Sequence, residues 1–477
     1  MADIFTSFSN LIKGEVVTPE HPEYESAIAR WAKNAERKAR VVVFVKDADD
    51  ISKSILFAKK NKLPIAIRGG GHNAAGASSS EGGLVIDLSR HLKTVRVDEE
   101  EKLAYVGGGA LWRHVDEEAI KYGLATVGGT VNHTGVGGLT VGGGYGWLSG
   151  RHGLTIDNLK QVTIITANGD ILTASATENN DLFWAIRGGG SNFGVVAEFM
   201  YKLHPQRKTV FAGPIIFAPT KLEKLVQVTK KWLENIKEDE GMNQICTVIE
   251  GKPVIALYIF FNGSEEEGKA NFKDFYDLGP FKEGAKEIPY ERLNGMLSDK
   301  VEHGICYYLS GISQKTPHYE STAEAIKKIT EVVQQGTFKA AVLFEFFSLA
   351  KVNSVSTEAT AFRRQLSHNI LCTVRWSASV DGPEKTGEAR QITKDVHEII
   401  LRGQGNLSAS EQQGYTNYGH DLDLPSSLLG HPSLDHNAAS SRSQNAFAEN
   451  YPRLQAIKKI YDPEHIFNKW YPIVPAA

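Results

Sequence analysis

Short apolar runs alternate with amphipathic stretches at the start of the chain. Val41–Val45 is an apolar run rich in β-branched residues, which favours a buried strand. Residues 47–61 then carry apolar side chains at helical spacing, with Asp49 or Asp50 expected as the N-cap. Leu63–Arg68 and Leu84–Leu88 are again short apolar runs. The pattern over this segment therefore predicts a β-α-β-loop-β unit.

Similar alternation continues to about residue 205, where we place a boundary near His204-Pro205. A helix is predicted over Leu111–Tyr122. Asn168-Gly169 lies between two predicted strands and is typical of a hairpin with a type I′ turn, which requires positive φ angles. The strands predicted in this segment are Lys102–Val106, Val162–Thr166, Asp170–Thr173 and Val195–Tyr201.

The middle of the chain, from about residue 205 to 410, predicts a sheet covered by helices. The strands are expected at Thr247–Glu250, Val254–Phe261, Ala341–Phe347 and Ile370–Arg375. The helices are expected at Leu222–Lys237, Glu265–Leu278, Ser321–Gln335 and Gly387–Leu401.

Composition narrows the class of protein. The 477 residues carry a formal net charge of −3, and such a balance disfavours nucleic acid as the main partner. Three widely spaced cysteines indicate neither a disulfide framework nor a metal site. No apolar run approaches the ~18 residues of a membrane helix, and the N-terminus lacks a secretory pattern. We therefore expect an intracellular, cytoplasmic protein that binds neither membrane nor metal; its oligomeric state is not predicted.

The most informative feature is the uneven distribution of the 45 glycines. Glycine runs after strands let backbone amides approach a ligand, and consecutive N–H groups form nests for anions. A diphosphate is the expected guest, and the alternative is that the runs are only flexible turns. The runs are RGGGHNAAG (68–76), GGG (107–109), GGT (128–130), GVGGLTVGGGYG (135–146) and RGGGSNFGVV (187–196).

Two common phosphate-binding motifs do not account for these runs. No run ends in the GK[ST] of a P-loop. Residues 69–74 match GxGxxA after a strand, but turn-forming sequence follows where a dinucleotide-binding motif must open a helix. Several glycine loops wrapped around one long cofactor explain the pattern better.

These runs closely resemble the FAD-binding domain of the vanillyl-alcohol oxidase and p-cresol methylhydroxylase superfamily, and more narrowly the berberine-bridge-enzyme-like FAD-linked oxidases. The C-terminal stretches YTNYGHDLDL (415–424) and YPRLQAIKKIYDPEHIFN (451–468) are similar to that family's closing segment. The resemblance implies an α+β flavoprotein whose PCMH-type FAD-binding domain, built of two α/β subdomains, covers residues 1–205. It implies a substrate-binding domain over 206–410, with an antiparallel sheet covered by helices, and a C-terminal segment, 411–477, that returns to the FAD domain.

The resemblance also implies a single covalent bond from His72, at the end of RGGGH, to the flavin; the alternative is a loop histidine bonded to backbone. Val131 stands where many relatives have a cysteine that forms a second link. Leu139 replaces a histidine that stabilises negative charge on the flavin. Thr134 stands where the family places a residue beside the oxygen-reactive face of the flavin, and its small size favours O₂ as acceptor.

The remaining cofactor contacts are carried over position by position from the family motifs. Glycines are expected at the diphosphate, and Asp157, Asn158 and Val195 near the adenosine. The full set besides His72 and Thr134 is Arg68, Gly69, Gly70, Gly71, Asn73, Gly129, Thr130, Gly137, Gly138, Gly142, Gly144, Leu148, Asp157, Asn158, Val195 and Asn468.

Four residues match the family's catalytic positions. Glu345 lies in the apolar stretch 341–347, where it is either a functional carboxylate or an edge-strand side chain facing water. Tyr418 matches a tyrosine that acts as the base or orients the substrate in relatives, so either Glu345 or Tyr418 is the expected base. Tyr145 matches an active-site tyrosine that faces the flavin, and Asn369 aligns roughly with a position in the same cavity. The resemblance implies an oxidase that moves a hydride from an alcohol, hemiacetal or amine carbon of a small molecule to flavin N5, with O₂ reduced to H₂O₂. A dehydrogenase with another acceptor, a redox-neutral or oxidative cyclase, and a flavin carrier without turnover are the alternatives.

Overall fold

The computed structural model describes residues 4–364, 367–405, 407–419 and 436–477. The first half begins with a four-stranded sheet of order β1-β2-β4-β3, in which β2 and β3 both run parallel to β4. Helix α3 (Ala48–Lys60) connects β2 to β3 and is capped by Asp47, whose side chain accepts from the Asp50 amide; the predicted caps were therefore wrong. The strands are β1 (Glu15–Val17), β2 (Val41–Phe44), β3 (Ile65–Arg68) and β4 (Leu84–Asp87).

A second, antiparallel sheet has the order β5-β6-β10-β8-β9. The hairpin predicted at Asn168-Gly169 joins β8 to β9, but only Gly169 has a positive φ, 81°. The type I′ turn is therefore wrong: the Gly169 amide bonds to the Thr166 carbonyl and the Thr166 amide bonds to that of Asp170, which makes a longer loop. The strands are β5 (Val95–Asp98), β6 (Leu103–Gly107), β8 (Leu159–Ile165), β9 (Ile171–Ser175) and β10 (Val195–Lys202).

Short helices lie before and between the strands of these two sheets, together with one small two-stranded ribbon. Strand β7 (Leu124–Ala125) pairs with β11 (His204–Pro205), where the chain leaves the first half. The helices are α1 (Ile4–Ser9), α2 (Tyr24–Ile28), α4 (Trp112–Ala119), α5 (Val136–Val141), α6 (Ser149–His152) and α7 (Asn180–Ile186). The glycine loops lie between these elements.

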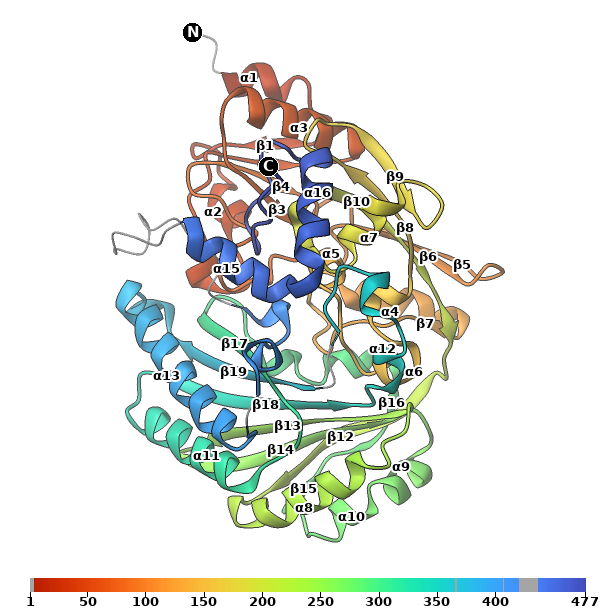
Figure 1. Ribbon diagram of the computed structural model, residues 1–477, viewed down its shortest axis with the longest axis vertical. Coiled ribbons are helices and arrows are strands. Elements are labelled where there is room, and N and C mark those ends of the chain that lie inside the picture. Colours follow the sequence, from red (N-terminus) through yellow and green to blue (C-terminus); the bar gives the residue numbers. More distant parts are fainter. Residues whose placement is uncertain (1–3, 365–366, 406, 420–435) are drawn as a thin grey trace.

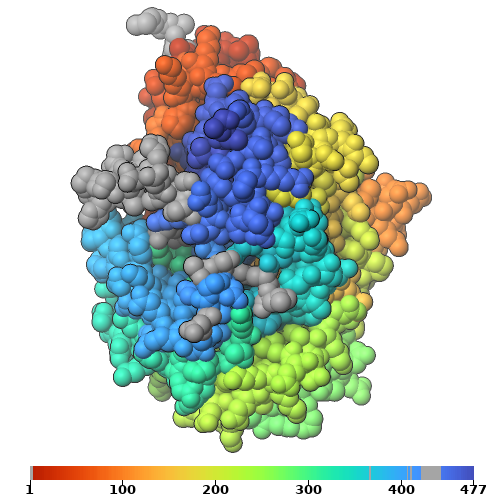
Figure 2. All heavy atoms as spheres, viewed as in Figure 1, coloured from red at the N-terminus to blue at the C-terminus, as the bar shows by residue number. Residues whose placement is uncertain are grey.

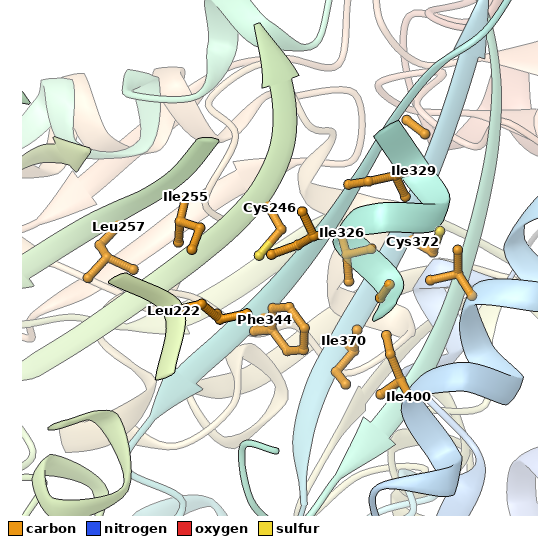
Figure 3. Packing of buried hydrophobic residues seen from close by; sticks show 14 of the residues in the cluster. Leu222, Cys246, Ile255, Leu257, Ile326, Ile329, Phe344, Ile370, Cys372 and Ile400 are labelled. Carbon is orange, nitrogen blue, oxygen red and sulfur yellow. The ribbon is translucent and has the colours of Figure 1, made fainter. Parts of the chain in front are cut away.

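The middle of the chain forms an eight-stranded antiparallel sheet of order β15-β12-β14-β13-β18-β19-β17, with β16 also paired to β12. One face packs on helices α8 (Leu222–Leu233), α11 (Tyr319–Gln334) and α13 (Pro383–Arg402), as the buried side chains in Figure 3 show. The strands are β12 (Thr209–Phe217), β13 (Glu240–Ile249), β14 (Lys252–Phe261), β15 (Lys282–Glu283), β16 (Lys286–Pro289), β17 (Cys306–Gln314), β18 (Lys339–Phe347) and β19 (His368–Trp376).

The opposite face of this sheet packs against the first half of the chain. Tyr258 and Phe347 share an apolar cluster with Trp147 and Leu148 from the glycine-rich segment. Asn243 and Glu345, register partners on β13 and β18 that point from this face, are therefore enclosed between the two halves. Helices α9 (Glu265–Asn271) and α10 (Lys273–Tyr276) follow β14, and Phe275 of α10 joins the helix-side cluster. Helix α12 (Ala350–Asn353) instead packs against the first half, where its Val352 shares a cluster with Tyr145.

The C-terminal segment lies over the first half of the chain (Figures 1 and 2). Phe447, Leu454 and Ile473 share a core cluster with Phe199 of β10. The helices are α14 (Ala409–Gln412), α15 (His436–Phe447) and α16 (Tyr451–Tyr461), and a short 3₁₀ turn covers Thr416–Tyr418. Residues 420–424 of the C-terminal motif lie outside the described residues.

A buried ion pair fixes this segment to the first half. Lys458 and Asp462 are both fully buried and lie 2.6 Å apart, and the Lys458 ammonium also donates to the carbonyls of Asn192 and Phe467 at 2.5 and 2.8 Å. We expect Asp462→Ala to lower the free energy of unfolding by about 3–5 kcal/mol, because it leaves a buried charge without its counter-ion. Urea unfolding measures this loss. The double variant Lys458→Met/Asp462→Leu should recover only part of it, because the amides of Ile466 and Phe467 lose their acceptor. A loss below about 1 kcal/mol in Asp462→Ala, as for a surface pair, would contradict the prediction.

No helix in the ranges that the structure describes is long and apolar enough to cross a membrane. Within the same ranges, no cluster of three or more His, Cys, Asp or Glu side chains has the arrangement of a metal site.

Candidate active site

Glu345 lies in β18, between β13 and β19 in the interior of the sheet. Alternation along β18 puts it on the same face as Phe347, toward the first half of the chain. Its side chain is only 2% exposed, so the alternative of an edge-strand glutamate facing water is wrong. A buried carboxyl requires hydrogen-bond partners, and the structure provides two.

Tyr418 and Asn369 hold this carboxyl from two directions. The Tyr418 hydroxyl donates to Oε1 at 2.8 Å, and the Asn369 amide donates to Oε2 at 3.2 Å. Burial raises the pKa of Glu345 to about 7, while these two hydrogen bonds act in the opposite direction. Burial and the neighbouring Glu345 raise the pKa of Tyr418 far above its ordinary value, so its hydroxyl keeps the proton at neutral pH. Glu345 is therefore a buried carboxyl, held by two donors, whose pKa lies near neutrality.

Tyr145 extends this group of side chains toward the glycine loops. Its ring packs edge-on against Tyr415 at 5.1 Å, and Tyr415 packs edge-on against Tyr418 at 5.0 Å. The Tyr415 hydroxyl accepts from the Gly144 amide at 2.9 Å and from the Asn417 side chain at 2.6 Å. The C-terminal turn is therefore tied to the glycine-rich segment, and Tyr145 and Asn369 line one small cavity. Its other walls are Gly188, Phe362, Arg363, Gly414, Tyr415, Thr416, Ala446 and Phe447.

His72 lies in a second cluster, made of aromatic and histidine rings. It stacks on Trp31 with 4.1 Å between ring centroids, and its Nε2 lies 3.1 Å from Nδ1 of His133. His303 packs against His133 at 4.8 Å. Burial, together with the two neighbouring histidines, lowers the pKa of His72 to about 3. The imidazole is therefore neutral at any working pH, as a nucleophile must be.

The glycine loops meet backbone to backbone. A Cβ atom built on Gly70 would lie 2.5 Å from the Gly135 amide nitrogen, and one on Gly137 would lie 3.0 Å from the Gly108 carbonyl. Gly138 is exposed, and a Cβ there would meet no heavy atom of the described chain within 4 Å. Three glycine runs thus converge on open space, with accessible backbone beside Gly138. This arrangement fits a long cofactor with a diphosphate.

Comparisons with known proteins agree with this geometry. The family described as "FAD binding domain" matches residues 39–175, and the family "Berberine and berberine like" matches residues 414–473. The FAD-linked oxidoreductase pgmH of Aspergillus terreus is 33% identical over 98% of this chain and 94% of its own length. The chain belongs to the berberine-bridge-enzyme-like family of FAD-linked oxidoreductases.

Other proteins resemble this flavoenzyme over nearly its whole length. The (R)-6-hydroxynicotine oxidase of Paenarthrobacter nicotinovorans is 27% identical, covering 97% of both chains. The crystal structure of 6-hydroxy-D-nicotine oxidase from Arthrobacter nicotinovorans superposes with a TM-score of 0.85 at 25% identity, covering 98% of each chain. Berberine bridge enzyme from Eschscholzia californica has the same fold, with a TM-score of 0.83 at 22% identity over 99% of this chain and 98% of that one. The predicted α+β flavoprotein fold is confirmed.

Several of the predicted FAD contacts of this oxidoreductase use their side chains within the protein. Arg68 donates to Asp87 at 2.9 Å, and the Asn73 side chain accepts from two amides of its own loop. Asp157 accepts from the Leu154 amide at 2.8 Å and forms a buried ion pair with Arg364. The polar atoms of these side chains already bond to other parts of the protein and hold the loops in shape. Any contact with FAD would be made besides these bonds.

The other predicted contacts divide into accessible and packed groups. Gly69, Thr130 and Thr134 are half-buried, as is Gly137, whereas Asn468 is exposed and donates to the His465 carbonyl. Asn158 bonds to His204 and to two carbonyls. Positions whose surroundings are filled by the chain are Gly71, Gly129, Gly142, Gly144, Leu148 and Val195.

The turn that contains Val131 and Thr134 lies beside His72. The Thr134 amide bonds to the Val131 carbonyl, which closes the turn that carries His133. Since His133 contacts His72, this turn lies at the proposed flavin attachment point. Leu139 touches the same segment, where its side chain would meet a Cβ on Gly129 at 2.5 Å.

Sequence reasoning missed Trp31 and Asn243, and both belong to these clusters. Asn243 is the register partner of Glu345 on the neighbouring strand. The strand predicted at Thr247–Glu250 actually begins at Glu240, because the polar residues of β13 interrupt its apolar pattern. Gly251 was the available sequence signal, because a glycine between two apolar runs indicates a tight turn; in the structure its φ is 75°. The strands on the two sides of such a turn pair along their whole length, so β13 should be as long as β14. Trp31 gives no local signal.

Proposed function

We propose that this protein is an FAD oxidase that carries the cofactor on a single covalent bond from His72 and oxidises an alcohol, hemiacetal or amine carbon of a small molecule, with formation of H₂O₂. The observation that carries this proposal is the Glu345 carboxyl. It is buried, held by Tyr418 and Asn369, and titrates near pH 7. A base poised near the working pH is what removal of an O–H or N–H proton requires.

Four residues of the chain would bind the substrate and move its proton. Bound FAD supplies the hydride acceptor. Glu345 accepts the proton of the substrate's O–H or N–H group, and Tyr418 keeps the carboxylate in place through its 2.8 Å hydrogen bond. Asn369 fixes the second oxygen, and Tyr145, on the wall shared with Asn369, orients the substrate. The burial of these groups excludes water from the proton transfer.

Single attachment is supported by the surroundings of His72 and by Val131. The neutral imidazole of His72 can attack the flavin methyl carbon, whereas the Val131 side chain cannot form a bond to the ring. Thr134, in the same turn, is smaller than leucine and leaves space for O₂. Relatives named as oxidases support O₂ as the acceptor.

An absorption spectrum followed by a substrate screen tests the proposal. The purified protein should show flavin bands, and acid precipitation should leave the flavin in the pellet. A panel of alcohols, reducing sugars and cyclic amines, including 6-hydroxynicotine, is then assayed for peroxide release and, without oxygen, for bleaching of the flavin. Bleaching without peroxide would indicate a dehydrogenase, and product without net bleaching would indicate a redox-neutral cyclase. A protein that binds no flavin would refute the proposal.

Tyr418→Phe tests the hydrogen bond to the base. The variant keeps the ring packing on Tyr415 but removes the donor that lowers the pKa of Glu345. The base then ionises only at higher pH, so the rising limb of kcat/KM should move to higher pH. At pH 7 we expect a loss of about 10²-fold, the lower end for a group that assists proton transfer. An unchanged pH profile would mean that Tyr418 does not act on Glu345.

A further inference from the structure

Asn243 is the one buried asparagine of the described chain whose side-chain amide makes no hydrogen bond. It is fully buried, and both Oδ1 and Nδ2 lack a partner. Burying a polar group without a partner destabilises a fold, and native proteins rarely do so without a reason. The other buried asparagines all make side-chain hydrogen bonds: Asn158, Asn192, Asn294, Asn369 and Asn450.

The position of Asn243 places this amide beside the proposed base. Its register partners are Glu345 on β18 and Tyr258 on β14. Directly opposite residues in an antiparallel sheet share a face and lie about 4.5–5.5 Å apart. Asn243 therefore projects toward the first half of the chain, as Glu345 does, while its neighbour Met242 packs under the helices. Although Asn243 and Glu345 are register partners, the Asn243 amide bonds neither to Glu345 nor to any other group of the described chain, so it is left for another partner.

We infer that Asn243 is a substrate-binding residue, and that it recognises a neutral substituent able both to donate and to accept a hydrogen bond, such as a hydroxyl group. This inference rests on the proposed function, because it assumes that the substrate binds beside Glu345.

The chemistry of an amide supports a neutral group of this kind. Oδ1 only accepts and Nδ2 only donates. A hydroxyl group can pair with either atom, because it donates its O–H to Oδ1 or accepts through its oxygen from Nδ2. A carboxylate would oppose Oδ1 and would lie close to the Glu345 carboxylate. An ammonium group would leave Nδ2 without an acceptor. A site built to bond a hydroxyl also discriminates strongly against a ligand that lacks it, because its own polar atoms then stay unpaired.

Phenol and toluene form a matched pair of probes, since a hydroxyl and a methyl group have nearly the same size. Binding to the flavin-loaded protein is followed by the change in the flavin absorption bands and by the rise in Tm. We expect phenol to bind at least about tenfold more tightly than toluene. In Asn243→Leu, which has nearly the same volume, this preference should disappear while toluene binding persists. Met242→Leu, a change on the same strand but on the helix-facing side, should keep the preference of the wild type.

Ligand-free stability separates recognition from a structural role. Since Asn243→Leu breaks no hydrogen bond with the described chain, its Tm should equal or exceed that of the wild type. A lower Tm, together with parallel weakening of both probes, would overturn the inference, as would a wild type without preference for phenol. If the leucine variant does not accumulate, Asn243→Val replaces it, since valine favours strands and cannot overpack the site.

The two proposals fail in different ways. Selective phenol binding without oxidation of any substrate would refute the oxidase function and leave the role of Asn243 standing. Substrate turnover with peroxide release, but without a preference for phenol over toluene, would refute the role of Asn243 and leave the oxidase function standing.

Discussion

Glu345→Gln is expected to lower kcat/KM of the flavin-loaded enzyme by about 10²–10⁴-fold, the usual contribution of a positioned general base. The amide keeps the size of the side chain and its contact with Tyr418 but cannot accept a proton. Since burial raises the pKa of Glu345 to about 7, the wild type should gain activity as the pH rises through 7 and then reach a plateau. The variant should lack this limb. Steady-state kinetics between pH 5 and pH 9 would record both effects.

Stability distinguishes this loss of activity from misfolding. A carboxyl whose pKa is raised in the folded state binds its proton more tightly there than in the unfolded chain. It therefore lowers the stability of the wild type as the pH rises toward and through 7. Glu345→Gln removes this effect, so its Tm should be no lower than that of the wild type at pH 8. Full activity in the variant would exclude Glu345 as the base and leave Tyr418 as the candidate.

His72→Ala is expected to abolish covalent flavin. In the wild type nearly all flavin should stay with the acid-precipitated protein, and in the variant nearly all should appear in the supernatant. The reason is that Val131 removes the second attachment point known from the family pattern, and the cysteines of this chain are buried in the helix-covered sheet. Flavin fluorescence of both fractions measures the result.

The matched control for this experiment is His21→Ala. His21 is an exposed histidine outside the glycine loops, so its loss should not change flavin retention. Retention in the His72 variant would reveal a second covalent link. A variant that binds no flavin at all, even without a bond, would show instead that the stack of His72 on Trp31 holds the loop in shape.

The sequence alone determined the flavoprotein family and much of the first half. The glycine runs indicated a diphosphate cofactor because a backbone that must approach a ligand closely excludes side chains. Short apolar runs predicted β2, β3 and β4 because buried parallel strands need apolar residues on both faces. Glu345 stood out for the same reason, as a single charge within an apolar strand.

Only the tertiary structure decided which polar residues work together. Tyr418 and Asn369 come from segments 73 and 24 residues away from Glu345, and no local pattern gives their distances. Strands β12 and β17 were missed because Gly213-Pro214 and Ser310-Gly311 interrupt their apolar pattern, and pairing across the sheet overrides that local signal. The role of Asn243 was also decided by the tertiary structure, because nothing in the sequence around this asparagine indicates that its amide has no partner. Only the fold buries this amide without a partner and places it opposite Glu345 on the neighbouring strand.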